Sequence, residues 1–133
     1  MHPDFSRAAG LTSAIIGAAI EVHRDKGPGL IESIYQWCLE IELEISRLEF
    51  ISQKLVTVSY NGFSKEEPLR FDVLVEGCVL VRPRLVVEVL PIHKAQLLSY
   101  LKLMIVPIGL LINFHALRLV DGVHRLVLPG ADR

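Results

Sequence analysis

Cysteine and long apolar runs are both scarce in this sequence, and their scarcity narrows the class of protein. Only Cys38 and Cys78 occur among the 133 residues, and no CxxC or Cys/His spacing predicts a zinc site. We interpret both as reduced core residues of a cytosolic protein. The longest apolar stretch, residues 103–114, is well short of the ~20 residues that a membrane-spanning helix needs. We therefore expect neither a zinc protein nor a membrane protein.

An excess of charge of one sign is also missing. The chain carries 14 Lys and Arg against 15 Asp and Glu, a formal net charge of -1. This balance excludes a globally basic nucleic-acid binder, although a local basic site stays compatible with it. No repeat, low-complexity segment or Pro/Gly/Ser-rich linker divides the sequence. We predict one domain over residues 11–133, after a loose N-terminus at residues 1–10.

Apolar side chains are abundant, at 51% of all residues. This share suggests either strands that are covered on both faces or an apolar interface in a homodimer. The apolar run at residues 14–22 has the look of a signal-peptide core. However, the charged residues Glu21, Arg24 and Asp25 interrupt or follow this run. No small-residue cleavage pattern follows it. We expect a helix of a cytoplasmic protein there.

Helical and strand periods alternate along the chain and predict a mixed sheet flanked by helices, an α/β or α+β domain. Two tight turns are predicted at Asn61-Gly62 and Glu76-Gly77. The expected elements are a helix at 12–26, a helix at 31–48, an antiparallel pair of strands at 55–60 and 69–75, a strand at 78–90, a helix at 92–104, a buried strand at 107–112, and a closing hairpin of 117–120 with 123–128.

Two groups of polar residues within the first 75 residues are candidates for a functional site. Glu32, Tyr35 and Gln36 share one helix face, although for Glu32 taken alone a solvated carboxylate, which a first helical turn favours, is the preferred explanation. Arg70 and Asp72 share one face of a predicted strand. A carboxylate there is costly to bury unless it is ion-paired or metal-bound, and both explanations stay open.

Two further features lie in the second half. Gln96 and Tyr100 are one turn apart on the predicted third helix, which also fits core packing plus a surface amide. The segment Arg82-Pro83-Arg84 interrupts an otherwise apolar strand. Because proline lacks a backbone N–H, it is normally confined to edge strands, strand ends or bulges.

In order and spacing, four segments resemble the GxxExxY family of PD-(D/E)xK nuclease-like proteins: residues 27–35, 70–72, 91–103 and 106–114. The resemblance extends over residues 11–128. It implies a restriction-endonuclease-like fold and Mg²⁺-dependent hydrolysis of phosphodiesters. The family's site has a helix glutamate matching Glu32, a strand aspartate matching Asp72, a Glu-x-Lys motif, and a Gln-x-x-x-Tyr helix matching Gln96 and Tyr100. In such a site the carboxylates hold Mg²⁺ and the lysine steadies the attacking water.

The sequence departs from this pattern where the Glu-x-Lys motif falls, on Arg82-Pro83-Arg84. Arg84 keeps a cation but not a titratable amine. Arg82 replaces a metal ligand by a fixed positive charge beside Asp72, where it opposes a divalent ion. Glu88 is predicted on the same strand face as Arg82 and Arg84, so it is a candidate to replace the lost ligand. However, it lies about 13 Å beyond Arg84 along an extended strand.

Our leading hypothesis is a degenerate nuclease-fold domain without efficient hydrolysis. In this hypothesis the guanidinium of Arg82 stands in for the metal and pairs with Asp72, and also with Glu32. We expect no Mg²⁺ to be bound.

The remaining role is then binding, either of DNA or RNA phosphate through Arg84 with Lys94 or Lys102, or of a protein partner. One alternative is an active Mg²⁺-dependent nuclease that adds Glu88 to the two family carboxylates. The other is a structural protein that acts as a homodimer.

Overall fold

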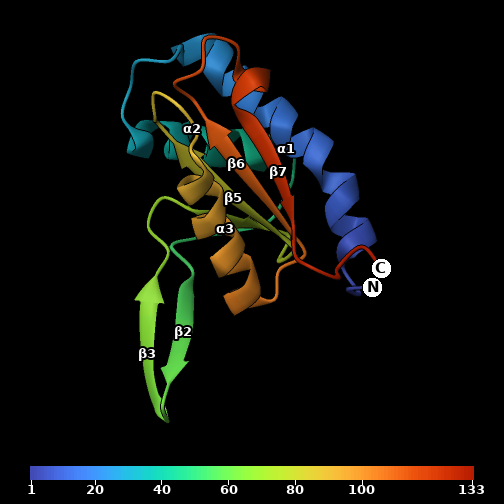
Figure 1. The fold of residues 1–133 in the computed structure, drawn as a ribbon. Coiled ribbons are helices and arrows are strands. Elements are labelled where there is room, and N and C mark those ends of the chain that lie inside the picture. Colours follow the sequence, from blue (N-terminus) through green and yellow to red (C-terminus); the bar gives the residue numbers. More distant parts are fainter.

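Five strands form a mixed β-sheet that helices cover on both faces (Figure 1). The computed structural model describes all 133 residues. The sheet order is β1-β4-β5-β6-β7, with β5 and β6 parallel and the other neighbours antiparallel. This confirms the predicted fold class. The elements are α1 (Phe5–Lys26), α2 (Glu32–Ile45), β1 (Phe50–Ser52), β2 (Leu55–Tyr60), β3 (Phe63–Pro68), β4 (Val73–Val75), β5 (Val79–Arg84), α3 (Pro91–Met104), β6 (Ile108–Asn113), the 3-10 helix η1 (Leu119–Gly122) and β7 (Val123–Val127).

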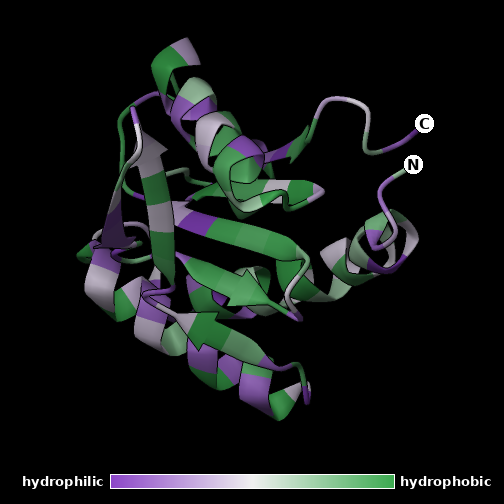
Figure 2. Cartoon of the chain, turned by 90° about the horizontal axis from the view of Figure 1, so that it is seen from below, coloured by the Kyte–Doolittle hydropathy of each residue, from purple (hydrophilic) through white to green (hydrophobic).

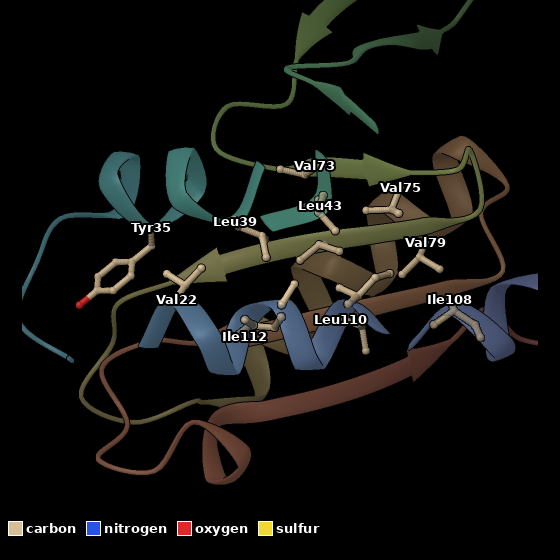
Figure 3. Packing of buried hydrophobic residues seen from close by; sticks show 14 of the residues in the cluster. Val22, Tyr35, Leu39, Leu43, Val73, Val75, Val79, Ile108, Leu110 and Ile112 are labelled. Atoms are coloured by element: carbon tan, nitrogen blue, oxygen red, sulfur yellow. The ribbon is translucent and has the colours of Figure 1, made fainter. Parts of the chain in front are cut away.

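The sheet separates two apolar clusters, because side chains alternate between its faces. Val79 and Val81 of β5 belong to the larger cluster with buried residues of α1 and α2, and Figure 3 shows these side chains converging on the strands. Leu80 belongs to the smaller cluster with Leu97 and Leu101 of α3. In Figure 2 the hydrophobic colour follows the inner strands, whereas the helices are striped. The site described below lies on the α3 face, at the end of β5.

The N-terminal prediction was wrong, because α1 begins at Phe5 and most of the expected loose terminus is helical. Ala8 is buried and continues the stripe of Thr12 and Ile15 at helical spacing, so the first turns pack with the rest of the helix. By length and composition alone α1 could also cross a membrane. Its buried face packs in the larger cluster, so we interpret it as a core helix.

The two predicted turns are confirmed, but the partner of β2 was wrong. Asn61 and Gly62 have φ of 48° and 82°, the left-handed values that a two-residue hairpin turn requires. The hairpin pairs β2 with β3, outside the main sheet, and not with the segment at 69–75. β4 instead pairs with β1, a strand that the sequence pattern did not predict.

Two element boundaries and one hairpin also differ from the predictions. The α2 helix ends at Ile45, and its buried side includes Gln36, whereas Ile45 is exposed. The strand at β5 ends at Arg84 and does not continue to residue 90. The closing hairpin is absent, because residues 119–122 form η1 and β7 pairs with β6.

Both cysteines are free. Cys78 is completely buried in the larger cluster, and burial raises the pKa of its thiol. Cys38 is partly buried beside the same cluster. A buried thiol with a raised pKa is unreactive, so Cys78 is a packing residue, as the sequence indicates.

Candidate functional site

A buried ion pair joins the end of β5 to the residue before β4. Arg82 and Asp72 are only 4% and 1% exposed in their side chains. Arg82 Nη2 donates to Asp72 Oδ2 at 2.6 Å, and Arg82 Nε lies 3.0 Å from Oδ2 and 3.2 Å from Oδ1. The contact that the sequence hypothesis predicts between these two side chains is confirmed. Both carboxylate oxygens are held by one guanidinium.

The position of Pro83 explains why a proline is tolerated between the two arginines. The backbone carbonyl of Arg84 accepts from the N–H of Phe114, so the backbone groups of Arg84 face β6. Those of Pro83 face the opposite edge, because they alternate along a strand. β4 begins at Val73, opposite Val81, and does not reach this point. The missing N–H of Pro83 therefore removes no ladder hydrogen bond.

Arg84 lies at the rim of the ion pair, between the two family carboxylates. Its Nη1 is 3.5 Å from Asp72 Oδ1 and 4.0 Å from Glu32 Oε2, and it donates to the carbonyl of Pro83 at 2.7 Å. Burial lowers the pKa of Arg84, and the neighbouring Asp72 partly offsets this effect. The sequence hypothesis placed Arg82 against Glu32, which is wrong, because Arg84 is the arginine near that carboxylate.

The α3 helix supplies Gln96 and Tyr100 from the same face. The ring of Tyr100 lies under the guanidinium of Arg82, with Cζ 4.8 Å from the ring centroid, within the range of a cation–π interaction. Gln96 is exposed. Its amide and the Tyr100 hydroxyl form no hydrogen bond within the chain. Both side chains line the same cavity.

This cavity has a volume of about 450 Å³. Its lining is largely polar and comprises Glu67, Pro68, Leu69, Arg70, Asp72, Arg82, Arg84, Gln96 and Tyr100. Glu32 is outside it, at the far side of Arg84. The cavity thus brings together four of the five predicted site residues and Arg82.

Arg70 reaches the cavity by a different route from the predicted strand. Phe71 has a φ of 65°, in the left-handed region, so the alternation is broken between Arg70 and Asp72. β4 begins only at Val73. Arg70 is exposed and forms no ion pair within the chain, yet it lines the cavity beside Asp72.

Three other candidates from the sequence lie elsewhere. Lys94 and Lys102 do not line the cavity. Burial lowers the pKa of His124 on β7, and the positive charge of Lys94 adds to this effect. Glu88 is exposed, beyond the end of β5. The prediction that Glu88 shares a strand face with Arg82 and Arg84 is wrong, because β5 ends at Arg84.

Asn113, which the sequence analysis did not single out, holds the chain after β5. Its Nδ2 donates to the carbonyl of Val86 at 2.8 Å, and its Oδ1 accepts from the N–H groups of Val86 and His115, both at 3.1 Å. Asn113 is the last residue of β6, and Arg84 is its partner in the register. A buried asparagine at the end of an apolar strand was the available signal, because such an amide needs partners.

Asn113→Ala should lower the free energy of unfolding by roughly 2–3 kcal/mol, because three hydrogen bonds of about 1 kcal/mol each are lost. Denaturant unfolding followed by circular dichroism measures the change. Gln96→Ala, which removes an amide without an intramolecular partner, is the control and should change stability by less than about 0.5 kcal/mol. Equal stabilities of the two variants would contradict a role for Asn113 in holding this segment.

Tyr35 has a structural role at the start of α2. Its hydroxyl donates to the carbonyl of Gly27 and accepts from the N–H of Leu30 at 3.1 Å. Its ring stacks on Phe114 with centroids 4.6 Å apart, and Figure 3 shows the hydroxyl directed away from the core strands. Tyr35 therefore fastens the loop that precedes Glu32, and lies in the core rather than in the cavity.

The residues at this site do not fit the Mg²⁺ ion that the family resemblance implies. Mg²⁺ requires oxygen ligands in a near-octahedral arrangement, whereas both oxygens of Asp72 already accept from Arg82. Glu32 is the second carboxylate, and Arg84 lies between the two. No group of three or more His, Cys, Asp and Glu side chains anywhere in the chain is arranged to hold a metal.

A larger hollow of about 740 Å³ lies at the other end of the sheet, around the Glu76-Gly77 turn. Two of its charged side chains are used within the fold: Arg7 donates to the carbonyl of Glu76, and the Glu76 carboxylate accepts from the N–H of Glu49. This hollow contains none of the predicted site residues.

Comparison with known proteins gave one match. A family model of the PD-(D/E)XK nuclease superfamily matches residues 9–126, which is most of the chain. No curated protein and no solved structure matches. The matched range contains every residue of the cavity and of the ion pair, and its fold agrees with the five-stranded mixed sheet. The GxxExxY family, a finer assignment, stays a prediction.

Proposed function

We propose, because the chain belongs to the PD-(D/E)XK nuclease superfamily, that it binds nucleic-acid phosphate without hydrolysing it efficiently. The observation that carries the proposal is the buried Arg82–Asp72 ion pair. The superfamily generally uses Mg²⁺, and a carboxylate whose oxygens are both held by a guanidinium does not offer them to a metal.

The charges at the four family positions support the same proposal. The family pattern has three carboxylates and one lysine, an excess of negative charge that Mg²⁺ offsets. In this chain Glu32 and Asp72 face Arg82 and Arg84, so the positions are balanced without an ion. A guanidinium balances charge as a metal does. It does not lower the pKa of a bound water, which is the metal's part in hydrolysis.

The cavity offers donors for a phosphate. Arg70 has no ion-pair partner, Arg84 is at the rim, and the Gln96 amide and Tyr100 hydroxyl have no partner within the chain. Arginine forks suit phosphate oxygens particularly well. We assign the phosphate to this side of the cavity, with Arg82 and Asp72 beneath it as a fixed, neutral base.

The test uses fluorescence anisotropy with labelled single-stranded DNA and RNA oligonucleotides of three and twelve nucleotides. The wild type should bind equally well in EDTA and in Mg²⁺ and should yield no cleavage products on a gel. Arg70→Gln and Arg84→Gln should each weaken binding about tenfold, the cost of one charge-assisted hydrogen-bonding contact. Each should also reduce the salt dependence of the affinity, by a slope of about 0.7 per lost phosphate contact.

Arg24→Gln is the matched control, because it removes one arginine charge from an exposed pair with Glu21 on α1. Its affinity should equal that of the wild type. The proposal is contradicted by Mg²⁺-dependent cleavage with the wild-type protein, or by variants of Arg70 and Arg84 that bind as tightly as the control.

A further inference from the structure

The β2–β3 hairpin, residues 55–68, projects from the body as an arm (Figure 1). Only its base is packed: Val56 is buried in the smaller apolar cluster, and the N–H of Leu69 donates to the carbonyl of Lys54. At the tip, Tyr60 and Phe63 are 77% and 79% exposed. They are the two most exposed aromatic side chains of the chain. An arm that presents two rings to solvent at its free end has the form of a contact element.

The two rings lie on the face of the arm that leads to the cavity. Residues paired across antiparallel strands share a face, as do alternate residues of one strand. Tyr60 is paired with Phe63, Val58 with Lys65, and Val56 with Glu67, so these three pairs form one face. Glu67 lines the cavity. Phe63 lies four residues from Glu67, about 13 Å along the strand.

We propose that the arm is a stacking platform for the bases of a single-stranded nucleic acid whose phosphate occupies the cavity. This inference rests on the proposed function. Aromatic side chains stack on any base, because every base has a π-face, and unpaired bases are the ones that expose it. The distance from cavity to tip lies within the extent of a single-strand site, which typically covers roughly 4–16 nucleotides.

The charge of the arm points to stacking and not to phosphate contact. Its charged residues are Lys65, Glu66 and Glu67, and Lys65 is already paired with Glu67. Attraction of phosphate is therefore left to Arg70 and Arg84 at the base. The two parts of the site should consequently differ in their response to salt, since counterion release accompanies phosphate contacts only.

The experiment compares the wild type with Tyr60→Val/Phe63→Val, which removes both rings and keeps residues of high β-propensity. For the labelled twelve-nucleotide single strand, as DNA and as RNA, the affinity of the variant should fall at least fivefold. The slope of its salt dependence should stay at the wild-type value, about -1.4 for two phosphate contacts. The trinucleotide, whose two phosphates are expected at Arg70 and Arg84, should bind equally to both proteins.

Ser59→Ala/Ser64→Ala is the matched control, because this pair lies on the opposite face of the arm at the neighbouring register. It should bind both oligonucleotides like the wild type. Circular dichroism and sedimentation velocity should show the same fold and the same association state for all three proteins.

Several results would overturn the inference. One is that the ring variant binds the twelve-mer as tightly as the wild type does. Another is that it loses the same factor of affinity for the trinucleotide and for the twelve-mer. A third is a change in its association state, which would mean that a second copy of the chain contacts the arm. If the wild type binds no oligonucleotide, the proposed function fails and the inference fails with it. If the trinucleotide binds through Arg70 and Arg84 but the rings have no effect, only the inference fails.

Discussion

Replacing Asp72 by alanine should lower the free energy of unfolding by about 3–5 kcal/mol, because the guanidinium of Arg82 is then left buried without a counter-charge. The side chain of Arg82 is only 4% exposed, so water does not reach it easily. For a chain of this length the loss corresponds to a fall of about 11–18 °C in the melting temperature. Differential scanning calorimetry and denaturant unfolding measure both quantities.

A double variant separates the effect of the unpaired charge from the loss of packing. Asp72→Leu combined with Arg82→Met replaces both charges by apolar side chains, and the double variant should lie within about 1–2 kcal/mol of the wild type. Arg24→Ala, which breaks the exposed pair with Glu21 on α1, should cost less than about 1 kcal/mol. If Asp72→Ala melts like the wild type, the pair does not hold this end of the sheet.

The centre of the site was predictable from the sequence because it depends on register along one chain. Counting between two motifs placed Arg82 in the metal-ligand slot beside Asp72, and a buried arginine must find an anion. Which of two arginines reaches Glu32 was not predictable, because that depends on how α2 lies across the end of β5. The same is true of Lys94 and Lys102, whose direction follows from the rotation of α3 on the sheet.

The second strand of the arm, β3, was missed for a different physical reason. Burial produces the alternation of apolar and polar residues by which strands are recognised, and β3 lies outside the core. Its sequence, Phe63-Ser64-Lys65-Glu66-Glu67-Pro68, therefore lacks the pattern. The apolar pattern favours the next segment, 69–75, as the partner of β2 instead. The Asn61-Gly62 turn sets the local pairing whether or not the paired residues are buried.

The exposed apolar residues of α2 show a second limit of prediction from the sequence. Trp37, Ile41 and Ile45 recur every four residues and are exposed in the monomer, whereas the buried stripe runs through Tyr35, Leu39 and Leu43. Both stripes have helical spacing, so periodicity alone does not tell which one faces the sheet. The homodimer suggested by the apolar composition stays a prediction, and sedimentation velocity at several concentrations tests it.

Arg82→Glu combined with Arg84→Lys should create a site for Mg²⁺ or Mn²⁺ that the wild type lacks. The substitutions supply a third carboxylate, free Asp72 from its guanidinium partner, and return a lysine to the place of Arg84. Without metal, the variant should be less stable than the wild type, because carboxylates crowded at a buried position repel one another. Mg²⁺ at one hundred times its Kd should then raise the free energy of unfolding by about 2.7 kcal/mol.

Titration calorimetry provides the direct measurement, with one saturable site in the double variant and no saturable heat in the wild type. Arg82→Gln combined with Arg84→Lys is the matched control, since it removes the same guanidinium without adding an anionic ligand, and it should bind no metal. Metal-dependent cleavage of nucleic acid by the glutamate variant alone would show that the rest of the site, Glu32, Gln96 and Tyr100, is still arranged for hydrolysis. A folded glutamate variant that binds no metal would instead mean that the site has diverged beyond these two positions. The neutral Arg82–Asp72 pair beneath the cavity would then not be the only feature that separates this chain from an active enzyme.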